Sequence, residues 1–199
     1  MIRRLLVLAA ALSLAACNAA VSERPLFSDR DARGAPALKP GLWAMIENTG
    51  EPCPFDAAHP PTPWPGCAKP VMISGETIGD LSQGETIMAY VFARGRPRIL
   101  QVEMKDQGIA DEAVYAYLAV EPAPVSGPVT AFTGWMVQCG PPGGGEGHST
   151  GLTGHPLPGM TIRNHACFAS SSRAIRSAAI PSRDWDHTIR VVWVGERAP

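Results

Sequence analysis

The chain has 199 residues, with 17 Lys and Arg, 18 Asp and Glu, and a formal net charge of −1 at pH 7. This balance argues against nucleic-acid binding, which needs a basic surface for the phosphates, and the length suits one domain that can fold without a metal. Its 20 Gly and 20 Pro argue against a helical protein and favour strands joined by turns.

The first residues have the pattern of a secretory signal peptide. Arg3 and Arg4 precede an apolar run over residues 5–14, which is too short to span a bilayer. The run ends in Leu14-Ala15-Ala16-Cys17, which resembles the lipobox of bacterial lipoproteins. The resemblance implies that residues 1–16 are a signal peptide that is removed, and that Cys17 then carries acyl chains that enter the lipid bilayer.

The same resemblance implies a place in the cell envelope. Each buried CH₂ group contributes about 0.8 kcal/mol, so acyl chains on Cys17 would hold the protein firmly at a membrane. Asn18 stands where the inner-membrane retention signal has Asp, and we therefore expect the outer membrane, facing the periplasm. The alternative is an ordinary secretory peptide cut near Ala15 or Ala16, which leaves Cys17 as a free or paired thiol.

Residues 17–40 have mixed charge, several prolines and no apolar period, which predicts a lipidated flexible tether. Residues 41–199 are expected to form a single β-rich periplasmic domain. Its first strand is predicted over residues 41–46, and a short second one over 71–73. The proline-dense segment 51–70 lies between them and excludes a helix or a central strand there.

Four further strands are predicted in series, over residues 85–93, 98–105, 113–121 and 129–138. Brief turns rich in Gly and Pro join them, so they are expected to be antiparallel neighbours in a meander. Both faces of the first and third carry apolar side chains, which indicates a sandwich, a small barrel or a sheet covered by a helix.

The remaining segments complete a mainly β fold with one C-terminal α-helix. Residues 139–159 are a long Gly- and Pro-rich loop, and residues 167–180 have apolar side chains at helical spacing before Pro181. A last strand is predicted over residues 188–194. No second apolar stretch approaches the roughly 20 residues of a spanning helix.

The four cysteines that lipidation leaves are expected to form two disulfides in an oxidising periplasm. Three connectivities are possible. We favour Cys53 with Cys67 and Cys139 with Cys167, because each bond then closes a loop rich in Pro or Gly. Each is expected to contribute about 3 kcal/mol.

Metal and catalytic sites are the weaker hypotheses. Five side chains could ligate zinc near the long loop, but only one pair is close in sequence and oxidation would remove the thiols: Cys139, His148, His155, His165 and Cys167. Residues 147–151 read Gly-His-Ser-Thr-Gly, but in the long loop they lack the strand-to-helix setting of a nucleophile elbow. His187 lies beside Asp184 and Asp186, a pattern more typical of a turn. We therefore expect no metal, no cofactor and no catalytic role.

Two binding hypotheses remain. Gly41-Leu42-Trp43 resembles the Gly-x-Trp motif that opens lipocalins, which implies a barrel binding a small apolar ligand. Five aromatic side chains would then line the cavity, although aromatic residues in strands are more often core: Tyr90, Phe92, Tyr115, Tyr117 and Trp135. Otherwise we expect a structural or interaction module of the envelope, with a protein as its partner.

Basic residues gather in the last quarter of the chain. They could serve an anionic lipid, a lipopolysaccharide or a cell-wall carboxylate, and the simpler interpretation is a solvated helix face. They are Arg163, Arg173, Arg176, Arg183 and Arg190.

Overall fold

The computed structural model describes residues 18–48, 50–60, 63–81, 86–104, 115–124, 127–143, 151–185 and 187–196. Within them the elements follow in the order β1 (Ala20–Ser22), α2 (Asp29–Ala32), β2 (Gly41–Glu47), β3 (Ala68–Ser74), β4 (Thr77–Asp80), β5 (Thr86–Ala93), β6 (Arg98–Glu103), β7 (Tyr115–Ala123), β8 (Ala131–Met136), β9 (Met160–Arg163), β10 (Ala166–Ala169), α3 (Ser172–Ser182) and β11 (Ile189–Gly195). None of the described helices is long and apolar enough to cross a membrane.

The chain divides into two compact units, each treated separately below. Unit 1 comprises Met1–Leu26, Met104–Tyr117 and Met136–Asp186. Unit 2 comprises Phe27–Glu103, Leu118–Trp135 and His187–Pro199. Most barrel strands belong to unit 2, whereas β1, β9, β10 and α3 belong to unit 1.

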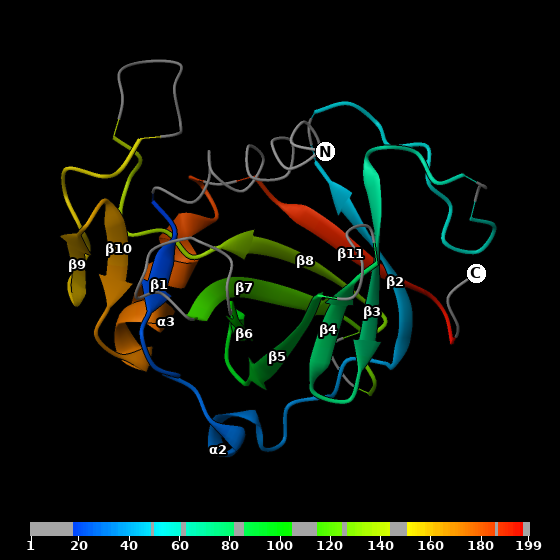
Figure 1. Cartoon of the computed structure of the whole chain (residues 1–199), viewed down its shortest axis with the longest axis horizontal. Coiled ribbons are helices and arrows are strands. Elements are labelled where there is room, and N and C mark those ends of the chain that lie inside the picture. The colour runs from blue at the N-terminus through cyan, green and yellow to red at the C-terminus, as the bar shows by residue number, and fades with distance from the viewer. Residues whose placement is uncertain are drawn as a thin grey trace, which may run out of the picture. The chain divides into compact units, whose positions relative to one another are not determined.

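The main feature of the sheet is a closed antiparallel barrel of eight strands, formed by β2 to β8 and β11 (Figure 1). Each strand pairs with the next along the chain, and the pairs of β6 with β7 and of β11 with β2 close the ring. The mainly β fold, the antiparallel meander and the C-terminal helix predicted from the sequence are confirmed, and of the predicted architectures the barrel is the one that forms.

Strand alternation separates an inner and an outer face of this barrel. Ile87 is 66% exposed, so its side of β5 faces outward, and Tyr90 and Phe92 lie on the opposite, inward side. The strand registers place Trp43 on that inward side too. Its side chain is fully buried, and its ring centroid lies 5.9 Å from that of Phe132. The interior near these rings is therefore filled by aromatic side chains.

The proline-rich loop between β2 and β3 covers part of the outer face. Cys53 and Cys67 form a disulfide across it, as predicted. Phe55 packs with Ala44 and Ile46 of β2, which alternate with the inward-facing Trp43. The bond thus holds an irregular segment against a regular strand, where its apolar side chains are buried.

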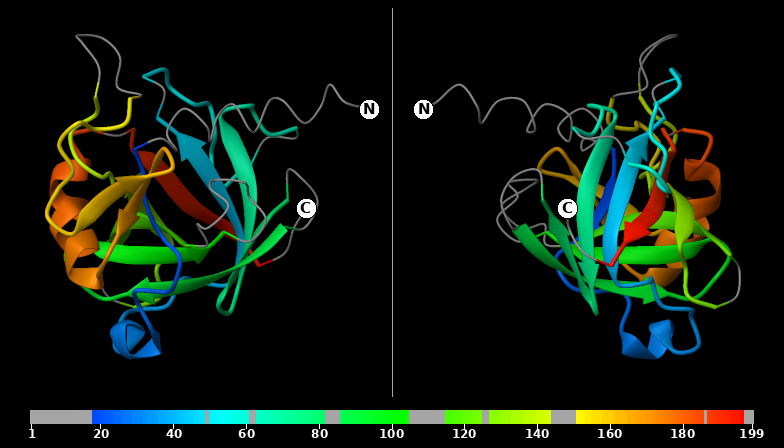
Figure 2. Two further views of the ribbon diagram at one scale, coloured as in Figure 1. Left: turned by 60° about the vertical axis from the view of Figure 1, so that its left-hand side comes forward. Right: turned by 90° about the vertical axis from the view of Figure 1, so that its right-hand side faces the viewer.

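Unit 1 contains the three-stranded arrangement β1, β10 and β9 together with α3 (Figure 2). β1 pairs parallel with β10 and antiparallel with the first residues of β7, while β9 and β10 form an antiparallel hairpin. Cys139 and Cys167 form the second predicted disulfide, which ties β10 to the segment that follows β8.

Three sequence expectations need correction here. The proline-dense segment 51–70 does not exclude a strand throughout, because β3 begins at Ala68 and includes Pro70, which pairs with Ala44 of β2. The described part of the expected tether, residues 18–40, is folded into β1 and α2 and contains the buried side chains Val21, Phe27 and Leu38. The predicted helix over 167–180 is also wrong at its start, because residues 166–169 form β10 and α3 begins only at Ser172. The strands β1 and β10 are too short to show alternation. They form because β1 pairs with β7 and β10, and β10 also pairs with β9.

The helix itself has the signals expected of it. Ser171 is its N-cap, and the Ser171 side chain accepts a hydrogen bond from the backbone N–H of Ala174. Pro181 does not stop the helix, since α3 extends to Ser182 with this proline inside its last turn. The boundary therefore lies two residues beyond the predicted end.

Candidate functional site

The proposed lipidation site, Cys17, lies outside the described residues, but the next residue is firmly placed. Asn18 is only 4% exposed. Its Nδ2 donates to the carbonyl oxygen of Gly140 over 2.8 Å, and its Oδ1 accepts from the N–H of Thr153 over 3.1 Å. The backbone N–H of Cys139 donates to the carbonyl oxygen of Asn18 over 2.7 Å. Three bonds therefore tie Asn18, the residue directly after Cys17, to the rest of unit 1.

Within unit 2, the predicted ligand-binding aromatic residues lie on two opposite sides of the sheet. Tyr90 and Phe92 lie on the inward side of β5, where they also line a groove of about 190 Å³ with residues 29–38. Trp135 lies on the opposite, outward side of the sheet, as the register of β8 with β11 shows. The other two predicted residues, Tyr115 and Tyr117, belong to unit 1.

Gly41 and Trp43 have a structural role where the first and last barrel strands meet. Gly41 has φ +129°, and a Cβ there would lie 2.2 Å from the carbonyl oxygen of Gly195, so the position accepts only glycine. The indole Nε1 of Trp43 donates to the carbonyl oxygen of Lys39 over 2.9 Å. Lys39 places its ammonium 3.3 Å from the ring centroid of Trp193 on β11. The motif therefore joins the first and last barrel strands.

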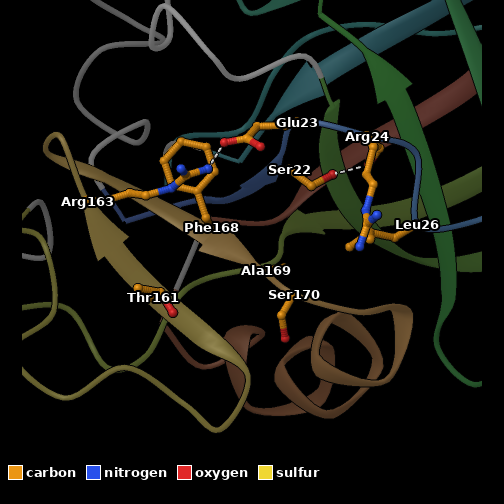
Figure 3. A pocket seen from close by; sticks show the side chains of 9 residues that line it. All are labelled: Ser22, Glu23, Arg24, Leu26, Thr161, Arg163, Phe168, Ala169 and Ser170. Atoms are coloured by element: carbon orange, nitrogen blue, oxygen red, sulfur yellow. Dashed lines mark hydrogen bonds and ion pairs between the residues drawn. The ribbon is translucent and has the colours of Figure 1, made fainter.

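A concavity of about 400 Å³ lies wholly within unit 1 (Figure 3). We call it the Arg24–Arg163 groove. Its polar and aromatic lining consists of Ser22, Glu23, Arg24, Thr161, Arg163 and Phe168. Leu26, Ala169 and Ser170 complete the wall.

Strand pairing positions these side chains. Thr161 and Phe168 are paired residues of the β9–β10 hairpin, and Val21 of β1 is paired with Phe168. Val21, Ala166 and Phe168 form one buried apolar cluster, which is the floor of this face. Two residues in the left-handed region, Asn164 and His165, join β9 to β10, as a type I′ hairpin turn requires. The tight turn fixes Arg163 at the end of its strand.

Charge in the groove centres on Arg163. Its guanidinium carbon lies 3.9 Å from the ring centroid of Phe168, so the cation stacks on the aromatic face. Arg163 also forms an ion pair with Glu23, and both side chains are nearly half exposed. In Figure 3, Glu23 points toward Arg163 and Phe168, whereas Arg24 lies on the other side of the groove beside Leu26.

A buried hydroxyl pair holds the segment that carries Glu23 and Arg24. The Ser22 Oγ donates to the carbonyl oxygen of Arg24 over 2.6 Å and lies 2.5 Å from the hydroxyl of Tyr117. Because the single hydroxyl proton of Ser22 is used, the Tyr117 hydroxyl must be the donor of that second bond. Burial raises the pKa of Tyr117 to about 12, so the phenol keeps its proton at neutral pH.

The other predicted ligands and bases are not assembled into a site. Cys139 and Cys167 are oxidised to a disulfide, and His155, His165 and His187 are exposed. His148 and Asp186 lie outside the described residues. Among the residues that the structure describes, no three His, Cys, Asp or Glu side chains lie together as metal ligands would.

Sequence reasoning missed most of the groove. It placed Glu23 and Arg24 in a tether and Phe168 in a helix, and it treated Arg163 as part of a solvated basic face. The usable signal was Asn164-His165, a turn pair between two short runs that read as strands once their pairing is known. No family model matches this chain, and no characterised protein or solved structure gives a significant match.

Proposed function

We propose that this protein is a lipoprotein of the bacterial envelope, held by acyl chains on Cys17, and that its strand-rich domain is a non-enzymatic structural or interaction module facing the periplasm. The observation that supports this most is the position of Asn18. Asn18, the residue that would follow the acylated cysteine, is buried and hydrogen-bonded to Gly140, Thr153 and Cys139.

The burial of Asn18 also changes what the anchor would do. Consecutive Cα atoms lie about 3.8 Å apart, so a lipidated Cys17 would sit directly against unit 1. Asn18 is hydrogen-bonded to Gly140, Thr153 and Cys139, so no free segment separates Cys17 from unit 1. The module would therefore act at the membrane surface and would not extend far into the periplasm.

The mass of the protein extracted from membranes in mild detergent tests this proposal. We expect cleavage before Cys17 and a mass increase for three acyl chains. Cys17→Ala should abolish incorporation of labelled palmitate and release the protein from the membrane or leave it uncleaved. Ser13→Ala is the control, because it changes the leader outside the four lipobox residues. Normal palmitate labelling of Cys17→Ala would overturn the proposal, and density fractionation distinguishes the outer from the inner membrane.

A second candidate function is binding of a small apolar ligand, as in lipocalins. The closed eight-stranded barrel favours it, together with Gly41 and Trp43 at the first strand. Of the three predicted aromatic residues in unit 2, Tyr90 and Phe92 share the inward side, whereas Trp135 lies on the outward side. Binding would therefore use the inward side of β5.

Titration with a fatty acid, followed by Trp fluorescence, tests this second function. A carrier should give a saturable change that Phe92→Ala weakens. Ile87→Ala is the matched control, because Ile87 lies on the same strand but is exposed on the outward side. Equal behaviour of the two variants, or no saturable change in the parent protein, would contradict ligand binding in the barrel.

A further inference from the structure

The Arg24–Arg163 groove combines features that a binding site for an organic anion needs. It is concave, it carries two guanidinium groups against one carboxylate, and it has an apolar floor. Arg24 makes no ion pair among those described for this part of the chain, whereas Arg163 is paired with Glu23. The local charge is therefore positive although the whole chain is slightly acidic.

The stacking of Arg163 determines how it can bind. The guanidinium carbon lies 3.9 Å from the Phe168 ring centroid, so the ring limits the positions that this cation can take beside the groove. A guanidinium held in this way matches the two oxygens of a carboxylate or a phosphate. Phe168 thus orients the cation and supplies apolar surface beside it.

Glu23 occupies the place that such an anion would take. Its carboxylate is bound to Arg163, and the pair is about half exposed to solvent. An exposed pair of this kind adds little stability, so fold maintenance does not account for it. We propose that the groove binds a small organic anion, a carboxylate or phosphate ester with an adjoining apolar group, and that the anion displaces Glu23 from Arg163 while Arg24 flanks it.

The remaining wall fits the same ligand class. Leu26 and Ala169 offer apolar surface for the body of the molecule, and Thr161 and Ser170 offer hydroxyl groups. The Ser170 Oγ donates to the carbonyl oxygen of Gly159 over 3.0 Å, so its oxygen lone pairs are available to a donor on the ligand. The inference does not depend on the lipid anchor or on the barrel interior.

The first test is an NMR titration of the untruncated chain, purified from the fraction that contains it, with phenyl phosphate as the probe. The expected result is a saturable shift of amides at Ser22, Thr161 and Phe168, with weak affinity that falls as salt rises. Inorganic phosphate is expected to bind several-fold more weakly, because it lacks the apolar group. Equal affinity for the two probes, or shifts spread over the whole surface, would overturn the assignment.

Charge variants give opposite expected signs. Arg163→Gln should weaken phenyl phosphate binding about tenfold, as loss of a hydrogen bond to a charged group predicts. Glu23→Gln should tighten it about threefold, because it removes the competing carboxylate. Arg163→Lys should give an intermediate loss, since the charge stays but the planar fork is gone.

Arg173→Gln is the matched control, because Arg173 is an exposed arginine on α3 that does not line the groove. The affinity of Arg173→Gln for phenyl phosphate should equal that of the parent protein. If Arg173→Gln weakens binding as much as Arg163→Gln does, the anion responds to overall charge and the site does not exist. Weaker binding to Glu23→Gln would equally overturn the proposal, because Glu23 would then support the site and not compete for it.

Discussion

The two units bury different kinds of side chain. Among the described residues six polar side chains are buried, and five of them lie in unit 1: Asn18, Ser22, Gln138, Thr153 and Ser182. Unit 2 has only Gln101, which bonds to both backbone groups of Phe27. Unit 2 instead buries large aromatic side chains such as Trp43 and Phe132. The buried polar side chains of the described residues are therefore concentrated in unit 1, while each unit contains one disulfide.

Buried hydrogen bonds explain how a region of short strands, such as unit 1, is held in one arrangement. Buried polar groups cost free energy unless they are bonded, so each bond that unit 1 makes selects one register. The backbone N–H of Gln138 donates to the Ser182 Oγ, which itself donates to the carbonyl oxygen of Ala178 in α3. A barrel of eight paired strands needs fewer such devices, because strand alternation already distinguishes its faces.

The substitution Trp43→Ala tests the contribution of packing in unit 2 and has the largest expected effect on stability. Trp43 is fully buried and contacts Phe132 inside the barrel, so its loss should destabilise the protein by about 3–5 kcal/mol. Trp193→Ala is the control, since Trp193 is only partly buried and should cost clearly less. Urea unfolding of both variants measures the difference. Trp193 is the register partner of Trp43 on the same face, so equal losses would mean that the deeper burial of Trp43 does not set its contribution to stability.

Removal of the Cys139–Cys167 disulfide tests unit 1. Cys139→Ser with Cys167→Ser opens a bond between residues 28 apart, which the chain-entropy model values at about 3.5 kcal/mol. The matched control is Cys53→Ser with Cys67→Ser, with a separation of 14 residues and about 3 kcal/mol expected. The two double variants should differ in where amide hydrogen exchange becomes faster. Exchange should accelerate at β1 and β10 only in the variant that lacks Cys139 and Cys167. Faster exchange in β2 and β3 of that variant would contradict the separation.

The barrel could be predicted because its information is local. Residues 85–93, 98–105, 113–121 and 129–138 show apolar alternation between short turns, and β5 to β8 form within or close to those bounds. The two disulfides followed from an even cysteine count and from the loops that each pair brackets. What remained undecided was whether the meander closes, because closure depends on pairing between β2 and β11, at opposite ends of the domain.

Unit 1 could not be predicted in the same way because its pairings are not local. β1 has three residues, Ala20 to Ser22, and its partners lie in β7 and β10. Cys167 and Phe168 have helical spacing with later residues, but they pair with the distant β1 as well as with β9 and so form a strand. The Arg24–Arg163 groove combines those two missed strands, so it was invisible for the same reason.

Asn18→Ala has the smallest expected effect on stability. Comparison with Asn48→Ala shows how much the buried hydrogen bonds of Asn18 contribute. The change leaves the carbonyl oxygen of Gly140 and the N–H of Thr153 without their buried partner, which should cost about 1–2 kcal/mol. Asn48→Ala is the control, because Asn48 is exposed and its bond to the Thr188 Oγ1 is long at 3.5 Å; we expect a change within about 0.5 kcal/mol. Thermal unfolding of the two variants at the same pH provides the measurement. If Asn18→Ala is as neutral as the control, the start of the chain is not held by these bonds, and a lipidated Cys17 would regain the freedom of a tether.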